Sequence, residues 1–111
     1  MFERTRQGTV DLIRGDQPLT VATVEEFCKV LDSCINQRQP RIVLDLSGIP
    51  LIDSRGMETL VDYQRQSMSY GGSIKLASAG SLCRDILKAT NVISLFDMFE
   101  NSITATGSFA K

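Results

Sequence analysis

The stretch IVLDLSGIPLIDSRGM, residues 42–57, decides the fold class of this 111-residue chain. Residues 42–46 are a short apolar run without helical period, and their length and branched side chains favour a buried strand, most simply a parallel one. Ile49 to Ile52 carries the chain on to Asp53, beyond which apolar residues recur at helical spacing. The stretch therefore predicts a strand, a loop and the start of a helix.

The elements around this stretch alternate in type. The further strands that we expect are short apolar or alternating runs: 9–13, a short edge strand from 18–19, 74–77 and 95–99. The helices that we expect show apolar residues at helical spacing: 24–37, residue 55 or 56 to about 69, and 81–90. This order predicts an α/β fold with a mixed, mostly parallel sheet and helices packed against it.

Capping and stop signals bound the expected helices. Thr23 and Glu26 have the spacing of a capping box, in which the hydroxyl accepts from the Glu26 amide and the carboxylate reaches back. Ser81 is suited to cap the third helix, and Asn91 to end it in a left-handed conformation. The tail from Ser102 is compatible with a short helix or with a frayed segment.

Composition and charge exclude several classes of protein. The 12 basic and 13 acidic residues give a net charge of -1, and no two basic residues are adjacent, which argues against nucleic-acid binding. No stretch approaches the roughly 18 apolar residues of a membrane span, so we expect no membrane insertion. The charged start, residues 1–7, lacks the apolar core of a signal peptide. We expect a cytoplasmic protein with a single domain over residues 1–111, its core at about 9–99.

The chain contains no histidine, which removes Ser-His-Asp triads and histidine-based zinc sites. A nucleophilic Ser54 would need a lysine as its base, and nothing suggests that Lys75, the nearest in sequence, reaches it. We therefore expect no catalytic residue, cofactor or metal, while nucleotide binding is neither supported nor excluded. Cys28, Cys34 and Cys83 form no C-x-x-C motif and are expected to be free thiols, mostly in the core.

The candidate site lies where the stretch passes from strand to helix. Ligands of such sheets meet the loops at the carboxyl ends of strands. These loops hold Asp45, Asp53, Ser54, Arg55 and Gly56. The glycine permits a close approach of backbone, or of a partner, at the first turn of the helix.

The segments DLSGIP (45–50) and IDSRGM (52–57), followed by Leu60, resemble the signature of STAS domains of the bacterial anti-sigma-factor-antagonist type. Further matches to the family pattern extend the resemblance over residues 9–99: Gly15, the helix after Thr23, Gly71-Gly72, Ile86-Leu87, Asn91 and Phe96. The whole spaced pattern is specific, whereas an Asp-Ser pair alone is not.

The resemblance implies a protein-binding switch controlled by phosphorylation at Ser54. In the family, an anti-sigma factor that is also a serine kinase phosphorylates this serine. The unphosphorylated protein binds the kinase and frees its sigma factor, phosphorylation ends the binding, and a serine phosphatase restores it. The alternative within the family is a module that is never phosphorylated and is a constitutive partner in a signalling or transport assembly. The implied partner-binding residues surround the helix start: Asp45, Asp53, Ser54, Arg55, Gly56 and Met57.

Each of these residues also has a structural interpretation. Ser54 is suited to be a plain N-cap, Asp45 a satisfied turn residue, and Met57 part of the core. Asp53 would orient the serine for a kinase, bind a partner's cation, or only stabilise the helix dipole. Arg55 departs from the family, which usually has Ser, Thr or Ala there. It is placed to pair with a phosphate or to hinder a kinase that expects a small residue.

Overall fold

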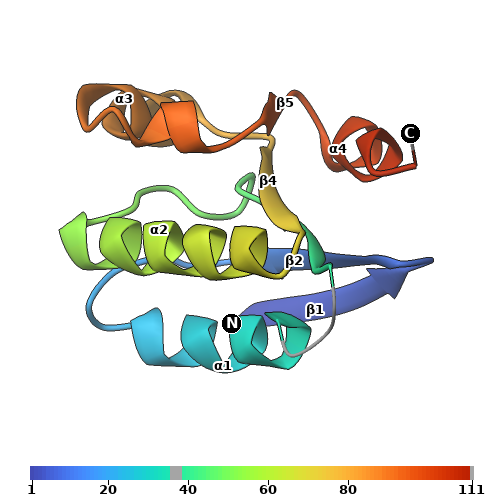
Figure 1. Ribbon diagram of the computed structural model, residues 1–111. Coiled ribbons are helices and arrows are strands. Elements are labelled where there is room, and N and C mark those ends of the chain that lie inside the picture. Colours follow the sequence, from blue (N-terminus) through green and yellow to red (C-terminus); the bar gives the residue numbers. More distant parts are fainter. Residues whose placement is uncertain (36–38, 111) are drawn as a thin grey trace.

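The computed structural model describes residues 1–35 and 39–110, and it confirms the α/β fold class (Figure 1). Five strands form one sheet: β1 (Phe2–Gln7), β2 (Val10–Gly15), β3 (Arg41–Asp45), β4 (Ser73–Ala77) and β5 (Met98–Phe99). Their order is β1-β2-β3-β4-β5, with β1 antiparallel to β2 and the other neighbours parallel. The helical elements are α1 (Val24–Ile35), α2 (Ser54–Ser69), α3 (Ser81–Ala89), the 3-10 turn η1 (Val92–Leu95) and α4 (Ser102–Ser108).

The sheet is covered on both faces, which explains why residues 42–46 read as a continuous apolar run. Ile42 and Leu44 pack into the larger core, which also holds the inner faces of α1, α2 and α3. Val43 points the other way, into a smaller cluster that includes Ala105 and Phe109 of the α4 segment. The ambiguous tail is thus a helix that covers the second face of the sheet.

The first strand of the sheet is absent from our prediction. The expected strand at 9–13 is β2, and β1 precedes it in a hairpin whose turn contains Gly8 at φ 63°. Of the β1 residues only Phe2 is buried, where its ring meets Phe27 of α1 edge to face. Because the other five β1 residues are exposed, β1 lacks the alternation that identifies a half-buried strand.

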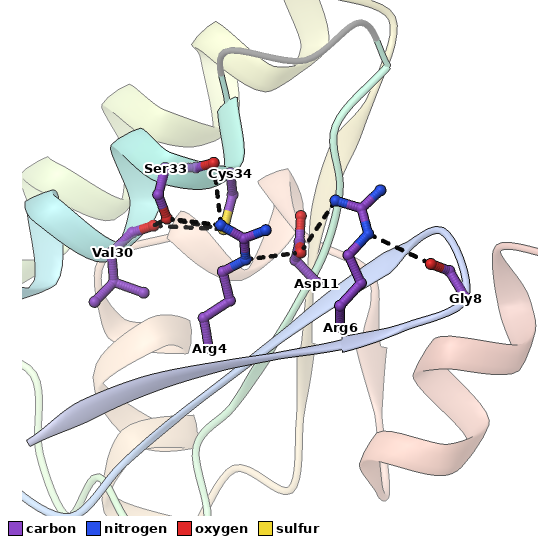
Figure 2. A network of polar contacts seen from close by, with 7 residues as sticks. All are labelled: Arg4, Arg6, Gly8, Asp11, Val30, Ser33 and Cys34. Atoms are coloured by element: carbon purple, nitrogen blue, oxygen red, sulfur yellow. Dashed lines mark hydrogen bonds and ion pairs between the residues drawn. The ribbon is translucent and has the colours of Figure 1, made fainter.

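A buried carboxylate connects this hairpin to α1 (Figure 2). Asp11 on β2 is 3% exposed, and its Oδ1 lies 3.0 Å from Arg4 Nε and 3.6 Å from Arg6 Nη1. Arg4 Nη1 also donates to the carbonyl oxygen and the hydroxyl of Ser33, near the end of α1. Two guanidinium groups therefore compensate the cost of burying the Asp11 charge.

The expected capping box of α1 is wrong. Thr23 Oγ1 accepts from the Thr20 amide at 3.0 Å and donates to the Pro18 carbonyl at 2.7 Å. The Glu26 carboxylate accepts instead from the Phe2 amide at 2.7 Å. The unpredicted strand β1 supplies this amide, and it takes the carboxylate that a capping box would have used.

The remaining helix boundaries are close to those expected. The helix expected at 24–37 is present as far as Ile35, and its last two expected residues lie outside the described range. Ser81 does not cap α3, because Gly80 takes the N-cap position and Ser81 is the first helical residue. Asn91 adopts the predicted left-handed conformation at φ 61°. The expected strand at 95–99 is shorter, because η1 continues to residue 95 and only 98–99 pair with β4.

The three thiols are free, as expected. Cys34 and Cys83 are buried, and Cys28 is half-buried. Burial raises the pKa of Cys34 to about 11, and the negative charge of Asp11 adds to this shift. The Cys34 thiol is therefore un-ionised at neutral pH and suited to packing rather than to redox chemistry.

Candidate functional site

The loops after β2 and β3 are joined immediately before α2. Leu19 and Ile52 form an isolated parallel bridge, in which the Leu19 amide donates to the Leu51 carbonyl at 3.0 Å. The Asp53 amide donates back to the Leu19 carbonyl at 3.1 Å. The short strand expected at 18–19 is thus a single bridge, and it fixes the backbone just ahead of Ser54.

Asp53 is the N-cap of α2. Its Oδ1 accepts from the Gly56 amide at 2.8 Å, and its Oδ2 accepts from the Val21 amide at 2.9 Å. These backbone donors, Gly56 first, hold the pKa of Asp53 below its ordinary value of 3.8. One charged carboxylate therefore caps the helix and holds the loop after β2 against it.

Ser54 is the first helical residue and its side chain is exposed. The interpretation of Ser54 as a plain N-cap is wrong, because Asp53 occupies that position and the conformation that goes with it. Within residues 1–35 and 39–110, the Ser54 hydroxyl makes no hydrogen bond. It is therefore an accessible hydroxyl at a helix N-terminus that the fold does not use for capping.

Gly56 is required by internal packing. A Cβ at this position would lie 2.4 Å from the carbonyl oxygen of Leu19 and 2.9 Å from its Cγ. The expected close approach of backbone is thus present, and it is made to the loop after β2. Met57 is only 6% exposed and belongs to the larger core, which confirms its core interpretation.

Arg55 extends from the exposed side of the first turn. Its Nη1 lies 3.4 Å from Glu58 Oε1, and the two side chains are 57% and 65% exposed. An ion pair with this exposure holds its partners weakly. The Arg55 guanidinium is therefore free to move toward a new anion beside Ser54.

Asp45 takes part in a separate cluster at the end of β3. Its Oδ1 accepts from the Ser47 amide at 2.9 Å, and its Oδ2 lies 3.3 Å from Arg14 Nε on β2. The side chain is buried, and both of its oxygens have partners within the fold. The interpretation of Asp45 as a satisfied turn residue is confirmed.

A groove of about 430 Å³ begins at Ser54 and runs between α2 and the segment α3–η1. We call it the α2–α3 groove. Its floor is made of apolar side chains from both sides: Ile52, Met57, Val61, Ile86 and Val92. Charged and polar side chains from the exposed side of α2 line it as well: Asp53, Ser54, Glu58, Asp62 and Arg65. The helical spacing in the sequence assigned Met57, Val61 and Ile86 to helix faces in the core, and the spacing 54, 57, 58, 61, 62, 65 is the signal that would have marked this second face.

The chain matches the model of the STAS domain over residues 2–105, and it belongs to that family. No curated protein sequence matches it. A putative anti-sigma factor antagonist from Thermotoga maritima is 22% identical, with a TM-score of 0.91 over 99% of this chain and 95% of that one. The phosphorylated Bacillus cell-fate determinant SpoIIAA is 16% identical, with a TM-score of 0.75 over 98% and 99%.

The same fold occurs as part of a larger protein. A murine anion transporter of solute carrier family 26 is 21% identical, with a TM-score of 0.78 over 96% of this chain and 18% of the transporter. At these identities the likeness shows the fold alone. Among the described residues of the present chain, no helix combines the length and apolar character that crossing a bilayer requires.

Proposed function

We propose that this chain is an anti-sigma-factor antagonist, a non-catalytic protein-binding switch controlled by phosphorylation at Ser54. The unphosphorylated form binds an anti-sigma factor that is also a serine kinase, and a serine phosphatase reverses the modification. One observation carries the proposal: the Ser54 hydroxyl is exposed, is not the helix cap, and lies at the end of an apolar groove. Asp53, Arg55 and the groove residue Met57 are the proposed contacts around it.

The physics of a phosphate at Ser54 supports a change in binding rather than in fold. A phosphoserine adds a charge of about -1.5 to -2 at neutral pH. The dipole of the α2 N-terminus stabilises that charge, and Arg55 is within reach to pair with it. A partner packed over Ser54 would have to remove the phosphate from water, which is costly. Binding is therefore lost while the domain stays folded.

Arg55 favours a second candidate function. A large cation next to the serine departs from the small residue usual in the family, and it would hinder a kinase that expects a small residue there. A STAS module that is never phosphorylated, and binds its partner constitutively in a signalling or transport assembly, accounts for this residue most simply. The two candidates differ in whether Ser54 ever carries a phosphate.

Intact-mass spectrometry of the protein from its native cells, with fragment mapping, tests the proposal. Ser81 is a matched internal control, since it is the exposed first residue of α3 with a glycine at its N-cap. We expect phosphate on Ser54 in a fraction of molecules and none on Ser81. No phosphate on Ser54 under any growth condition would favour the constitutive module.

Partner binding supplies the second half of the test. A kinase captured with the Ser54→Ala variant should lose affinity for Ser54→Asp and keep it for Ser81→Asp. All three variants should retain the circular dichroism of the parent, since neither serine is an N-cap. Equal binding of Ser54→Ala and Ser54→Asp would count against a switch at this position.

A further inference from the structure

We propose that the α2–α3 groove is the docking site for an apolar segment of the partner protein that carries Lys or Arg beside its apolar residues. This inference rests on the proposed function of Ser54 and specifies the chemistry of the partner. The groove starts at that serine and continues away from it along α2 to Arg65. The apolar floor of the groove indicates the apolar residues of the proposed ligand, and its charged edge indicates the basic ones.

The floor of the groove is apolar and incompletely covered. Val61 of α2, Ile86 of α3 and Val92 of η1 are each only half-buried, and they face a shared space of about 430 Å³. Leu82 is 51% exposed and precedes Ile86 by one turn of α3, so the two lie on the same face. Leu82 does not line the groove, but it adds exposed apolar surface on the face of α3 that carries Ile86, and a space of this size suits several partner side chains.

The edge of the groove is acidic. Asp53, Glu58 and Asp62 line the groove against Arg65, and Arg55, outside the groove, forms only a weak exposed ion pair with Glu58. This excess of negative charge is local to the groove, because the whole chain carries a net charge of only -1. Asp62 has no ion-pair or hydrogen-bond partner among residues 1–35 and 39–110. Complementarity of charge therefore favours a basic segment, and a basic segment is also attracted at long range.

An acidic groove is compatible with a phosphate that ends binding, because the two ends of the groove meet different parts of a kinase. At the Ser54 end, a partner packed over the serine would have to remove a phosphate from water, next to the carboxylate of Asp53, which is costly. Further along α2, the basic residues of the partner meet Asp62, where the attraction persists.

Selection from a random peptide library displayed on phage, against the full unphosphorylated chain, tests the docking site. We expect enriched peptides in which apolar residues are flanked by Lys or Arg. A synthetic copy of the strongest peptide should lose about tenfold in affinity for Ile86→Ser or Asp62→Lys, as is typical for the loss of an anchor or a paired charge. Matched controls are Ile103→Ser, at an 83% exposed position of α4, and Asp85→Lys, on the exposed side of α3. These should change the affinity by less than about twofold.

Three results would overturn the docking site: no enriched peptide, peptides without basic residues, or an affinity that the groove substitutions leave unchanged. Dimerisation in sedimentation experiments that Ile86→Ser abolishes would assign the groove to a second copy instead. The outcome is separable from that of the switch. If the groove binds basic peptides but Ser54 is never phosphorylated, only the proposed switch is refuted. If Ser54 is phosphorylated but the groove binds no peptide, only the proposed docking site is refuted.

Discussion

Substitution of Gly56 by alanine tests whether the start of α2 is held against the loop after β2. The new Cβ would lie 2.4 Å from the Leu19 carbonyl oxygen, so the two atoms must separate by about 0.6 Å to reach even 3.0 Å. The Leu19 backbone resists this movement because both its amide and its carbonyl are bonded to the segment before α2. Overpacking of this kind costs about 1–3 kcal/mol, and the helix propensity of alanine returns at most about 1 kcal/mol.

Gly107→Ala is the matched control, because Gly107 also lies in a helix and a Cβ there would meet nothing within 4 Å. It receives the same gain in propensity without the clash. The difference between the two variants therefore isolates the steric term at about 1–3 kcal/mol. Urea unfolding should place the midpoint of Gly56→Ala about 1 M below that of Gly107→Ala, for a slope near 2 kcal/mol per molar. Equal midpoints, or a higher one for Gly56→Ala, would refute the packing argument.

Three further predictions concern the charges and thiols around the core. The fold holds the pKa of Asp53 below its ordinary value of 3.8, so the charged carboxylate stabilises the fold fully above pH 3.8 and loses this effect as the pH falls below it. The difference in free energy of unfolding between wild type and Asp53→Asn should therefore shrink between pH 4 and pH 2. Urea unfolding across this range measures it, and a constant difference would contradict the capping role. Arg4→Gln should destabilise the fold by about 1–2 kcal/mol, because it removes one of the charged donors to the buried Asp11; a loss below about 0.5 kcal/mol would show that the pair matters little. A thiol reagent at pH 8 should label Cys28 first, since Cys34 is buried with a pKa near 11; peptide mapping that finds Cys34 labelled at a similar rate would show that the segment opens.

The sequence was sufficient to predict those strands and helices whose apolar residues recur with a regular period. The apolar run 42–46 and the helical faces of α1 and α2 follow from burial, which repeats along the chain. The sequence was insufficient to predict β1, because the residues of β1 after Phe2 are exposed and show no alternation of apolar and polar side chains. The missing strand then caused a second error, because its amide takes Glu26 away from the capping box expected at α1.

The site shows the same limit at a finer scale. The sequence places Asp53, Ser54 and Gly56 together at the start of a helix, and the structure does so too. Which of the two neighbouring residues caps the helix depends on a difference of one residue in the boundary, and sequence patterns rarely fix boundaries that closely. The groove depends on the distance between α2 and α3, which no local pattern records.

The two edges of the sheet bear on how concentrated the protein can become. The unpaired side of β1 belongs to a strand that carries Glu3, Arg4 and Arg6, and the opposite edge is the two-residue strand β5. Charged side chains on one edge and an edge too short to pair on the other are both protections against strand-to-strand aggregation. Neither edge therefore offers a template on which further copies can add, so the folded protein is protected from this route of aggregation even at high concentration.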